Sequence, residues 1–417
     1  MAEVKAVRRP VKEEWLLEGS TESKSIVNPI RDIVDGRKLE QNPQKNLVSL
    51  SIGDPTVFGN LPVHDVMKQA VKDAVDSGTC NGYGPAQGLA MTRRAVAAHY
   101  STPEAPLTED DVIMSCGCSG ALDMCITVLG NPGQNILIPR PGFGLYSCLS
   151  VPRGIEARHY DLVPDRQWEI DLDHLEQLID ANTVSIVVTN PSNPCGSVYS
   201  KKHLLDILAV AERHFLPIIG DEIYDGMVFK GQQFYSLASL SKNVPILSCG
   251  GIAKRYLVPG WRVGWILIYD KNETFKKEIF PCLLSTTRKI LGPSTILQAA
   301  LPDILAKVPQ SYFKNTMNVV EANANAVYSE LSAVPGLKPV MPSGAMYMMV
   351  GIDLKHFPNL NTAVDFMEKL MSEQSVFCLP GECFQYPGFF RLVLSMPNDK
   401  VKEACARIKE FCTKHYV

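Results

Sequence analysis

The middle of the chain alternates short apolar runs with segments in which apolar residues recur at helical spacing. The short runs lie at 112–115, 135–139, 184–189, 216–220 and 246–250. Near-continuous apolar strands that alternate with helices are typical of a parallel sheet covered by helices on both faces. We therefore predict an α/β fold whose large domain holds a mainly parallel sheet flanked by helices.

The pattern changes after about residue 294. Long helical stretches at 294–308 and 311–333 are followed by strand-like segments and further helices. Near the N-terminus, 48–52 resembles a short strand and 62–77 a helix, and we expect this end to pack with the C-terminal part. The predicted organisation is an N-terminal arm with part of a small α+β domain at 1–75, a large cofactor-binding domain at 76–300 and a small C-terminal domain at 301–417.

Composition excludes several classes of protein. The chain has 417 residues, of which 46% are hydrophobic and 20% charged, and its net charge is -3. Because there is no basic surplus and no long apolar stretch, we expect neither a nucleic-acid partner nor a membrane partner. The N-terminus lacks the apolar run of a secretory signal, and its acidic residues argue against a mitochondrial presequence. We therefore expect a cytoplasmic protein, with the mitochondrion as the alternative.

The twelve cysteines are scattered along the chain and include no CxxC pair. Cys116 and Cys118 are one residue apart, which is not the spacing of a zinc site. A disulfide framework is not expected in a chain of this size with this spacing. We therefore predict reduced thiols and no metal ion.

The stretch 246–266 places Lys254 and Arg262 on a glycine-rich bend between two expected strands. Glycine lets the backbone approach a bound group closely. A lysine there is able to form a Schiff base with an aldehyde, and an arginine is able to grip a phosphate as a planar fork. Pyridoxal phosphate (PLP) carries both groups and is the candidate cofactor. The alternative is a structural loop, because most lysines and arginines are solvated surface charges.

Other polar or aromatic residues follow the predicted strands, where ligands bind in open α/β sheets. Ser119 belongs to a glycine-rich turn that opens a helix, where free N–H groups attract an anion, although a plain helix cap has the same pattern. Phe143 is able to stack on a flat ring or to belong to the core. Asn193, in a doubled Asn-Pro loop, is able to donate to a phenolic oxygen or simply to shape a turn.

Asp221 and Tyr224 follow the apolar run at 216–220. A carboxylate at the end of a buried strand is costly unless a cation pairs with it, and the protonated pyridine nitrogen of PLP is such a cation. Tyr224, three residues on, is placed to reach the ring oxygen. Each strand-end residue has an ordinary structural explanation, but together they match every functional group of PLP.

Three motifs resemble those of class I aminotransferases. They are GIAKRYLVPGWRVG (251–264), NPSNPCG (190–196) and DEIY (221–224), in the family's order and spacing. The resemblance covers about residues 15–417 and implies the fold type I PLP architecture, with a large and a small domain. It also implies a homodimer with shared active sites at the interface. The apolar anchor of the N-terminal arm, Trp15 to Leu17, then packs either on the partner subunit or as an ordinary tail.

The resemblance implies a role for each residue that would hold the cofactor. Lys254 would be the Schiff-base lysine and the proton shuttle, and Asp221 would pair with the pyridine nitrogen. Asn193 and Tyr224 would contact the ring oxygen, while Phe143 would stack on the ring. The phosphate ligands would be Cys118, Ser119 and Arg262, together with Tyr83 reaching in from the neighbouring subunit.

The resemblance also implies that Arg391 clamps the substrate α-carboxylate, helped by Asn193 and the backbone of Gly53. Two departures matter. Gly251 stands where the aspartate-specific branch has a phosphate-binding serine, which makes Ser248 the candidate replacement. That branch also uses a second arginine, from the partner subunit, for the side-chain carboxylate of dicarboxylic substrates, and the corresponding region here offers Arg288, in an insecure alignment.

The implied activity is transfer of the amino group of an aromatic amino acid, above all tyrosine, to a 2-oxo acid such as 2-oxoglutarate or pyruvate. Specificity for alanine or aspartate is the first alternative. A C–S lyase or an aminocyclopropane-carboxylate synthase would use the same cofactor site, and assays with cystathionine and S-adenosylmethionine discriminate them. A catalytically silent PLP-fold protein is a further alternative, against which the intact Lys254, Asp221 and Arg262 argue.

Overall fold

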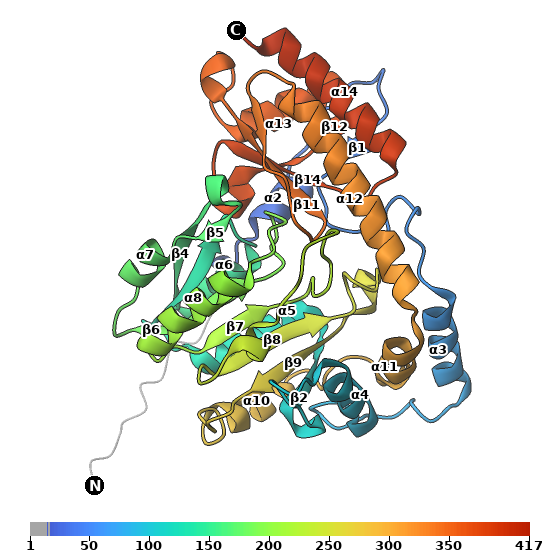
Figure 1. Ribbon diagram of the computed structural model, residues 1–417, viewed down its shortest axis with the longest axis vertical. Coiled ribbons are helices and arrows are strands. Elements are labelled where there is room, and N and C mark those ends of the chain that lie inside the picture. The colour runs from blue at the N-terminus through green and yellow to red at the C-terminus, as the bar shows by residue number, and fades with distance from the viewer. Residues whose placement is uncertain (1–14, 16) are drawn as a thin grey trace.

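A sheet of eight strands forms the centre of the larger part of the molecule, in the order β2-β9-β8-β7-β6-β3-β4-β5 (Figure 1). The computed structural model describes residues 15 and 17–417, so residues 1–14 and Leu16 of the expected N-terminal arm lie outside the described part. The strands are β2 (Val112–Cys116), β3 (Asn135–Arg140), β4 (Glu156–Val163), β5 (Glu169–Ile170), β6 (Thr183–Thr189), β7 (Ile218–Asp221), β8 (Ile246–Gly251) and β9 (Val263–Tyr269).

The sheet is mainly parallel, which confirms the prediction. β3 pairs in parallel with β4 and β6, and the parallel pairing continues from β6 to β7 and from β7 to β8. β9 runs antiparallel to both β8 and β2, and β5 runs antiparallel to β4. Because β9 is reversed, its first residue lies at the edge where β2, β7 and β8 end. We call this edge the carboxyl edge of the sheet.

The strands are apolar on both faces because two different cores cover them. Leu247 and Ile219 pack in one core with α5 (Gly117–Leu129), whereas the neighbouring residues Ile246 and Ile218 pack in a second core with α8 (Lys201–Arg213). Successive side chains of a strand point to opposite faces, so each face needs its own apolar set. The remaining helices of this part are α4 (Ala90–Tyr100), α6 (Leu145–Ser150), α7 (Leu172–Gln177), α9 (Leu237–Leu240) and α10 (Ile279–Thr287).

A third core joins α3 (Asp65–Asp76) and α11 (Thr295–Lys307) to β9. Met67 of α3 and Leu301 of α11 are fully buried in this core, as is Trp265 of β9. The helix predicted at 62–77 therefore forms, and it packs mainly with α11 and the large sheet, with Phe313 at the start of α12 (Gln310–Ser332) in the same core. The domain limits at residues 75 and 300 stay predictions.

The C-terminal part holds a second sheet, in the order β10-β11-β14-β13. Its strands are β10 (Leu337–Pro339), β11 (Tyr347–Ile352), β13 (Leu379–Pro380) and β14 (Phe389–Val393). Its helices are α12 (Gln310–Ser332), α13 (Ala363–Gln374) and α14 (Asn398–His415). The short strand β1 (Val48–Ser49) pairs in parallel with β12 (Val376–Phe377), so the N-terminal segment does join the C-terminal part. Two short helices, α1 (Thr21–Lys24) and α2 (Pro29–Val34), precede β1.

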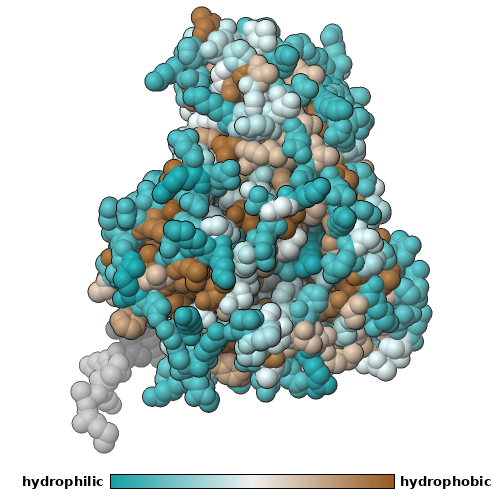
Figure 2. All heavy atoms as spheres, in the orientation of Figure 1, coloured by the Kyte–Doolittle hydropathy of each residue, from teal (hydrophilic) through white to brown (hydrophobic). Residues whose placement is uncertain are grey.

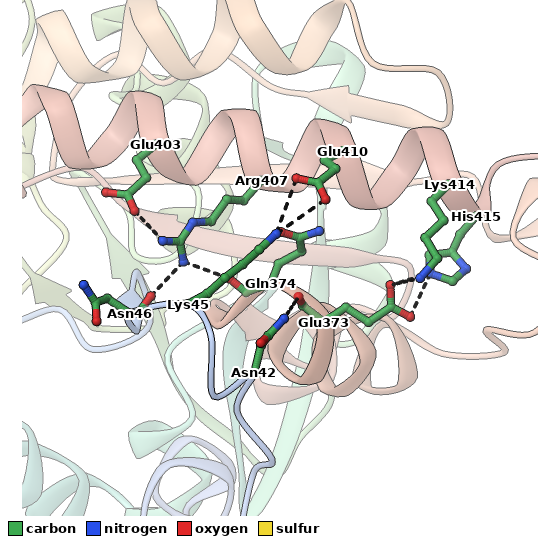
Figure 3. Close-up of polar contacts among 10 residues, drawn as sticks. All are labelled: Asn42, Lys45, Asn46, Glu373, Gln374, Glu403, Arg407, Glu410, Lys414 and His415. Carbon is green, nitrogen blue, oxygen red and sulfur yellow. Dashed lines mark hydrogen bonds and ion pairs between the residues drawn. The ribbon is translucent and has the colours of Figure 1, made fainter.

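The segment before β1, residues 42–46, is fixed by polar contacts to α13 and α14 (Figure 3). Arg407 of α14 donates to the carbonyl oxygens of Asn46 at 2.7 Å and Gln374 at 2.9 Å. The side-chain amide of Asn42 donates to the carbonyl oxygen of Glu373 at 2.8 Å. We call residues 42–46 the strap, because the chain runs directly from it through β1 to Ser51 and Gly53.

Hydrophilic residues cover most of the face shown in Figure 2, and hydrophobic residues occur there as separate patches. Within the described residues, no helix combines the length and the apolar character needed to cross a membrane. Trp15 and Leu17 are 93% and 80% exposed in the single chain, so this chain alone does not bury these two residues of the N-terminal anchor.

Candidate active site

A cavity of about 280 Å³ lies at the carboxyl edge of the large sheet, against the segment that follows β1 and the sheet of the C-terminal part. This is where an open α/β sheet is expected to bind a ligand. Of the residues predicted from the sequence, the cavity lining includes Gly53, Cys118, Ser119, Phe143, Asn193, Asp221, Tyr224, Lys254, Arg262 and Arg391. Tyr83 and Ser248 are not part of the lining.

Lys254 lies in the loop between β8 and β9, as the sequence predicts. Its Nζ donates a hydrogen bond of 2.5 Å to the carbonyl oxygen of Gly53. The amine therefore points into the cavity and toward the segment that the strap positions. An amine held there is free to react with a bound carbonyl compound.

Asp221 is the last residue of β7 and is 3% exposed. The hydroxyl of Tyr146 donates to its Oδ2 at 2.6 Å, and Cys118 Sγ lies 3.6 Å from its Oδ1. Burial raises the pKa of the Asp221 carboxyl, and the Tyr146 hydrogen bond opposes this rise. Among the described residues no lysine or arginine forms an ion pair with this carboxylate, which lines the cavity.

Arg391, on β14, is buried and has only uncharged partners. Its Nη1 donates to Asn193 Oδ1 at 2.8 Å, and its Nη2 donates to the carbonyl oxygen of Ser51 at 2.5 Å. Its guanidinium carbon lies 4.4 Å from the ring centre of Tyr347. Nε is buried without a hydrogen-bond partner among the described residues. Burial lowers the pKa of this guanidinium. Because its hydrogen-bond partners are uncharged, an anion that enters the cavity would meet a cation without a counter-charge among the described residues.

Tyr224 and Tyr347 share a hydrogen bond of 2.7 Å between their hydroxyls. Both side chains are about 1–2% exposed, and their rings meet edge to face. Burial raises the pKa of Tyr224 well above its ordinary value, so this hydroxyl stays protonated. It is therefore able to donate a hydrogen bond to a ligand oxygen in the cavity.

The anion-binding end of the cavity is formed by α5 and Arg262. Cys118 and Ser119 lie in the first turn of α5, a 13-residue helix, where backbone N–H groups are unpaired and the helix dipole favours an anion. Arg262 has a φ of 54°, in the left-handed region, and its side chain donates to the carbonyl oxygens of Pro259 at 3.1 Å and Cys116 at 3.4 Å. A cation and a helix N-terminus thus meet at one place.

Ser248 does not reach the cavity, contrary to the expectation that it replaces a phosphate-binding serine. Its hydroxyl donates to Glu222 Oε2 at 2.6 Å. The next residue, Cys249, faces α5, with its Sγ 3.6 Å from Cys125 Sγ, so strand alternation turns Ser248 to the opposite face. A serine at position 251 would not fit either, because a Cβ there would lie 2.6 Å from the carbonyl oxygen of Val263.

Two other residues of the sequence analysis lie away from this cavity. Tyr83 is 96% exposed, on the loop between α3 and α4. Arg288 is exposed directly after α10 and is not part of the lining. Neither position contributes to the site within a single copy of the chain.

The sequence analysis missed several residues of the site. Asn28 and Arg31, at the start of α2, line the cavity, as does Tyr347 of β11. Tyr146 supports Asp221 from α6. Its place three residues after Phe143, in the first turn of α6, was the only local signal for it. Nothing in the local sequence around Asn28 and Arg31 places the N-terminal segment over the sheet edge.

A partly buried lysine, a buried carboxylate and a buried arginine thus converge on one cavity with an anion site at its end. The family model "Aminotransferase class I and II" matches residues 45–408, and the chain belongs to this family. Its fold class and its character as a transaminase are thereby established.

More particularly, the chain is similar to tyrosine aminotransferases. It is 55% identical to "Tyrosine aminotransferase" of Mus musculus and 54% identical to that of Homo sapiens, in both cases over 97% of this chain and 89% of the relative. The crystal structure of tyrosine aminotransferase from Leishmania infantum superimposes with a TM-score of 0.93 at 35% identity, covering 96% of this chain and 99% of that one.

Proposed function

We propose that this protein transfers the amino group of tyrosine, and of other aromatic amino acids, to a 2-oxo acid, with PLP held at Lys254. The observation that carries the proposal is the convergence of Lys254, Asp221 and Arg391 from three separate elements on one cavity. The similarity to tyrosine aminotransferases over nearly the whole chain supports tyrosine as the amino donor.

The cavity fits PLP on grounds that do not depend on the relatives. Asp221 is a buried carboxylate without a lysine or arginine in ion-pair contact among the described residues, which suits a protonated ring nitrogen. The first turn of α5 and Arg262 suit a phosphate. Phe143 lines the cavity and offers a flat ring for stacking. When bound, the cofactor would supply a carbonyl for covalent attachment and an electron sink for the substrate Cα.

The chain's own residues would bind the substrate and move one proton. Arg391 would bind the α-carboxylate, because its Nε lacks a partner and its guanidinium lacks a counter-charge. Lys254 would take the proton from the Cα of the amino donor in the first half-reaction. It would deliver a proton to the Cα of the acceptor in the second, since its amine projects into the same cavity. Asp221 would keep the ring nitrogen protonated, and Tyr224 would donate to the ring oxygen.

The part of the cavity near α2 would hold the substrate side chain. Ile30, Val34 and Ile52 line it and provide apolar contact for an aromatic ring. Arg31 lines the same region, and among the described residues its one ion pair is a long contact of 3.4 Å with Asp35 in which both side chains are 61% exposed. Arg31 is therefore available to bind the second carboxylate of 2-oxoglutarate, which Arg288 of the same copy does not approach from its position after α10.

We further propose a homodimer in which Tyr83 of one copy completes the phosphate end of its partner's cavity. Its 96% exposure in the single chain supports this, since a tyrosine that serves its own site would be expected to line it. A cytosolic location is proposed on the twelve cysteines, all of which are free.

The test measures the two half-reactions on the PLP-loaded protein with tyrosine, phenylalanine, alanine, aspartate and glutamate as donors. Lys254→Ala is expected to lower transamination by about a thousandfold, because the proton would lose its acceptor. Arg31→Met is expected to weaken the binding of glutamate and 2-oxoglutarate by about tenfold and to leave the binding of tyrosine nearly unchanged. The reason is that only the dicarboxylic substrates lose a charged hydrogen bond.

Near-normal transamination by Lys254→Ala would overturn the assignment of this lysine. A clear preference of the unaltered protein for aspartate over tyrosine would overturn the proposed donor. Equal losses for tyrosine and glutamate in Arg31→Met would show that Arg31 supports the fold of the site and does not select the acceptor.

A further inference from the structure

Two residues that directly follow active-site residues form an ion pair beneath the cavity. Asp225 comes after Tyr224, and Arg255 comes after Lys254. Arg255 Nη1 donates to Asp225 Oδ2 at 3.1 Å, and the two side chains are only 17% and 11% exposed. Neither residue lines the cavity, so the pair does not contact a bound ligand there.

The guanidinium of Arg255 is enclosed by several elements. Its carbon lies 4.6 Å from the ring centre of Phe313, in the first turn of α12. Gly226, with a φ of 66°, leaves room for it, because a Cβ there would lie 3.1 Å from the guanidinium carbon. Other titratable groups close to Asp225 are His99 and Tyr100 at the end of α4, Tyr256 next to Arg255, and Glu222. The pair therefore joins the loop after β7, the loop after β8 and two helices.

Through α12, this contact is connected to the C-terminal part of the molecule as well as to the large sheet. Phe313 belongs to the core formed with α3 and α11, whereas Val320 and Val327 of the same helix belong to the core that includes the C-terminal sheet. Figure 1 shows α12 extending from the neighbourhood of α11 to α14. Arg255 thus lies where the long helix leaves the large part of the molecule.

A buried ion pair is a poor source of net stability, because desolvating two charges offsets most of their attraction. It is effective at fixing geometry, since an arginine fork accepts few orientations and an unpaired charge is costly in the interior. The backbones that it ties together carry the hydroxyl of Tyr224 and the amine of Lys254. Tyr224 would hold the cofactor ring, and Lys254 must stay at a fixed distance from that ring to reach the proton on the substrate Cα.

We propose that the Asp225–Arg255 ion pair is a positioning device that holds Lys254 and Tyr224 in register with each other. This inference rests on the proposed function, because it assigns the pair a role in the reaction of that same site. Arg255 and Asp225 act through their neighbours along the chain and are positioning residues.

The test compares the PLP-loaded variants Arg255→Met, Arg255→Lys, Asp225→Asn and the double variant Asp225→Asn/Arg255→Met. The single removals are expected to lower kcat about tenfold to a hundredfold with little change in KM for tyrosine, as a small displacement of reacting groups does. The pH at which the visible absorbance of the bound cofactor changes is expected to shift, because that absorbance reports the surroundings of Lys254. Arg255→Lys should recover part of kcat by keeping the charge.

The double variant separates positioning from folding. It leaves no unpaired buried charge, so its thermal stability is expected to recover while kcat and the absorbance shift do not. The matched control is Arg158→Met, which breaks a pair of 2.7 Å with Asp180 near the start of β4, far from the carboxyl edge. It should alter neither kcat nor the absorbance.

The inference is overturned if the Asp225 and Arg255 variants change thermal stability alone, or if the double variant regains kcat together with stability. It is also overturned if Arg158→Met causes the same losses. Failure of the proposed function would look different, because the unaltered protein itself would then neither bind PLP nor transaminate tyrosine.

Discussion

Asp221 and Glu222 are consecutive acidic residues whose side chains lie on opposite faces of the large sheet. Asp221 meets α5 and the cavity, whereas Glu222 accepts hydrogen bonds from Ser248 at 2.6 Å and from the backbone N–H of Leu237 at 3.0 Å, at the start of α9. Burial raises the pKa of Glu222 to about 7, and the hydrogen bonds from Ser248 and Leu237 oppose the rise. One carboxylate is therefore available to a ligand, and the other belongs to the interior of the fold.

The raised pKa of Glu222 makes folding stability depend on pH. In the unfolded chain this carboxyl has its ordinary pKa of 4.5, against about 7 in the folded protein. Between these values folding takes up protons, so the free energy of unfolding falls as pH rises from about 4.5 to about 7 and stays lower above. The contribution is about 3 kcal/mol. Glu222→Gln should remove this part of the pH dependence, as measured by urea unfolding at about pH 5 and about pH 8.

The control for this measurement is Glu330→Gln, which changes an exposed carboxylate on α12. It should leave the pH dependence of unfolding as it is in the unaltered protein. If Glu222→Gln shows the same loss of stability with rising pH as the unaltered protein, Glu222 is ionised in the folded state and the expected linkage does not exist.

Among the elements, the strap links the folding stability of the protein most directly to the geometry of the active site. Residues 42–46 are held against the end of α13 by Lys45 and against the middle of α14 by Arg407 (Figure 3), and the chain then passes through β1 to Gly53. Gly53 accepts the hydrogen bond of Lys254, and Ser51 accepts that of Arg391. Two of the groups that would bind substrate and cofactor are thus oriented by a segment that the C-terminal helices anchor.

Arg407→Met is expected to lower the free energy of unfolding by about 1–3 kcal/mol, because it leaves the carbonyl oxygens of Asn46 and Gln374 without their donor. It should also raise KM for tyrosine, since Ser51 and Gly53 would be held less firmly. Urea unfolding and steady-state kinetics measure the two effects. Glu403→Gln is the control, as it weakens one ion pair of Arg407 but keeps both carbonyl contacts. A destabilised Arg407→Met with an unchanged KM would show that the strap serves stability alone.

For the whole molecule, the single chain leaves two large side chains of the large part almost fully or mostly exposed. Tyr83 is 96% exposed, and Ile290, shortly after α10, is 69% exposed. Both belong to the large part of the molecule and are candidates for burial against a second copy. In a twofold dimer each such group occurs twice in the one interface, once from each copy.

If the active sites are shared, mixing two inactive or impaired variants should restore activity. A dimer of one Lys254→Ala copy and one Tyr83→Ala copy has one cavity with both native residues, so a mixture allowed to exchange subunits should regain transamination. The control is a mixture of Lys254→Ala with Asp221→Ala, whose defects lie in the same cavity and leave no intact site in the mixed dimer. Recovery in neither mixture, with subunit exchange verified by mass, would contradict the shared site.

Much of the site could be predicted from the sequence because its residues follow strands. Lys254, Asp221 and Asn193 each come directly after an apolar run, and parallel strands bring such residues to one edge by topology alone. Ser248 was misplaced because the sequence around it does not show which face of β8 meets α5. Arg31 was missed because its helix reaches the cavity only through the packing of the N-terminal segment on the C-terminal part.

The amino-acid sequence alone determined the alternation of strands and helices, the polar residues at the strand ends and the match between those residues and one cofactor. These features are local, since hydrophobic periodicity and glycine-rich turns depend on neighbours along the chain. Only the tertiary structure decided that Arg391 donates to Asn193 with no acidic partner among the described residues, and that Ser248 donates to Glu222. It also decided that Asp225 and Arg255 form an ion pair outside the cavity lining. Those contacts join residues tens to hundreds of positions apart, and their geometry depends on how sheets and helices pack against one another.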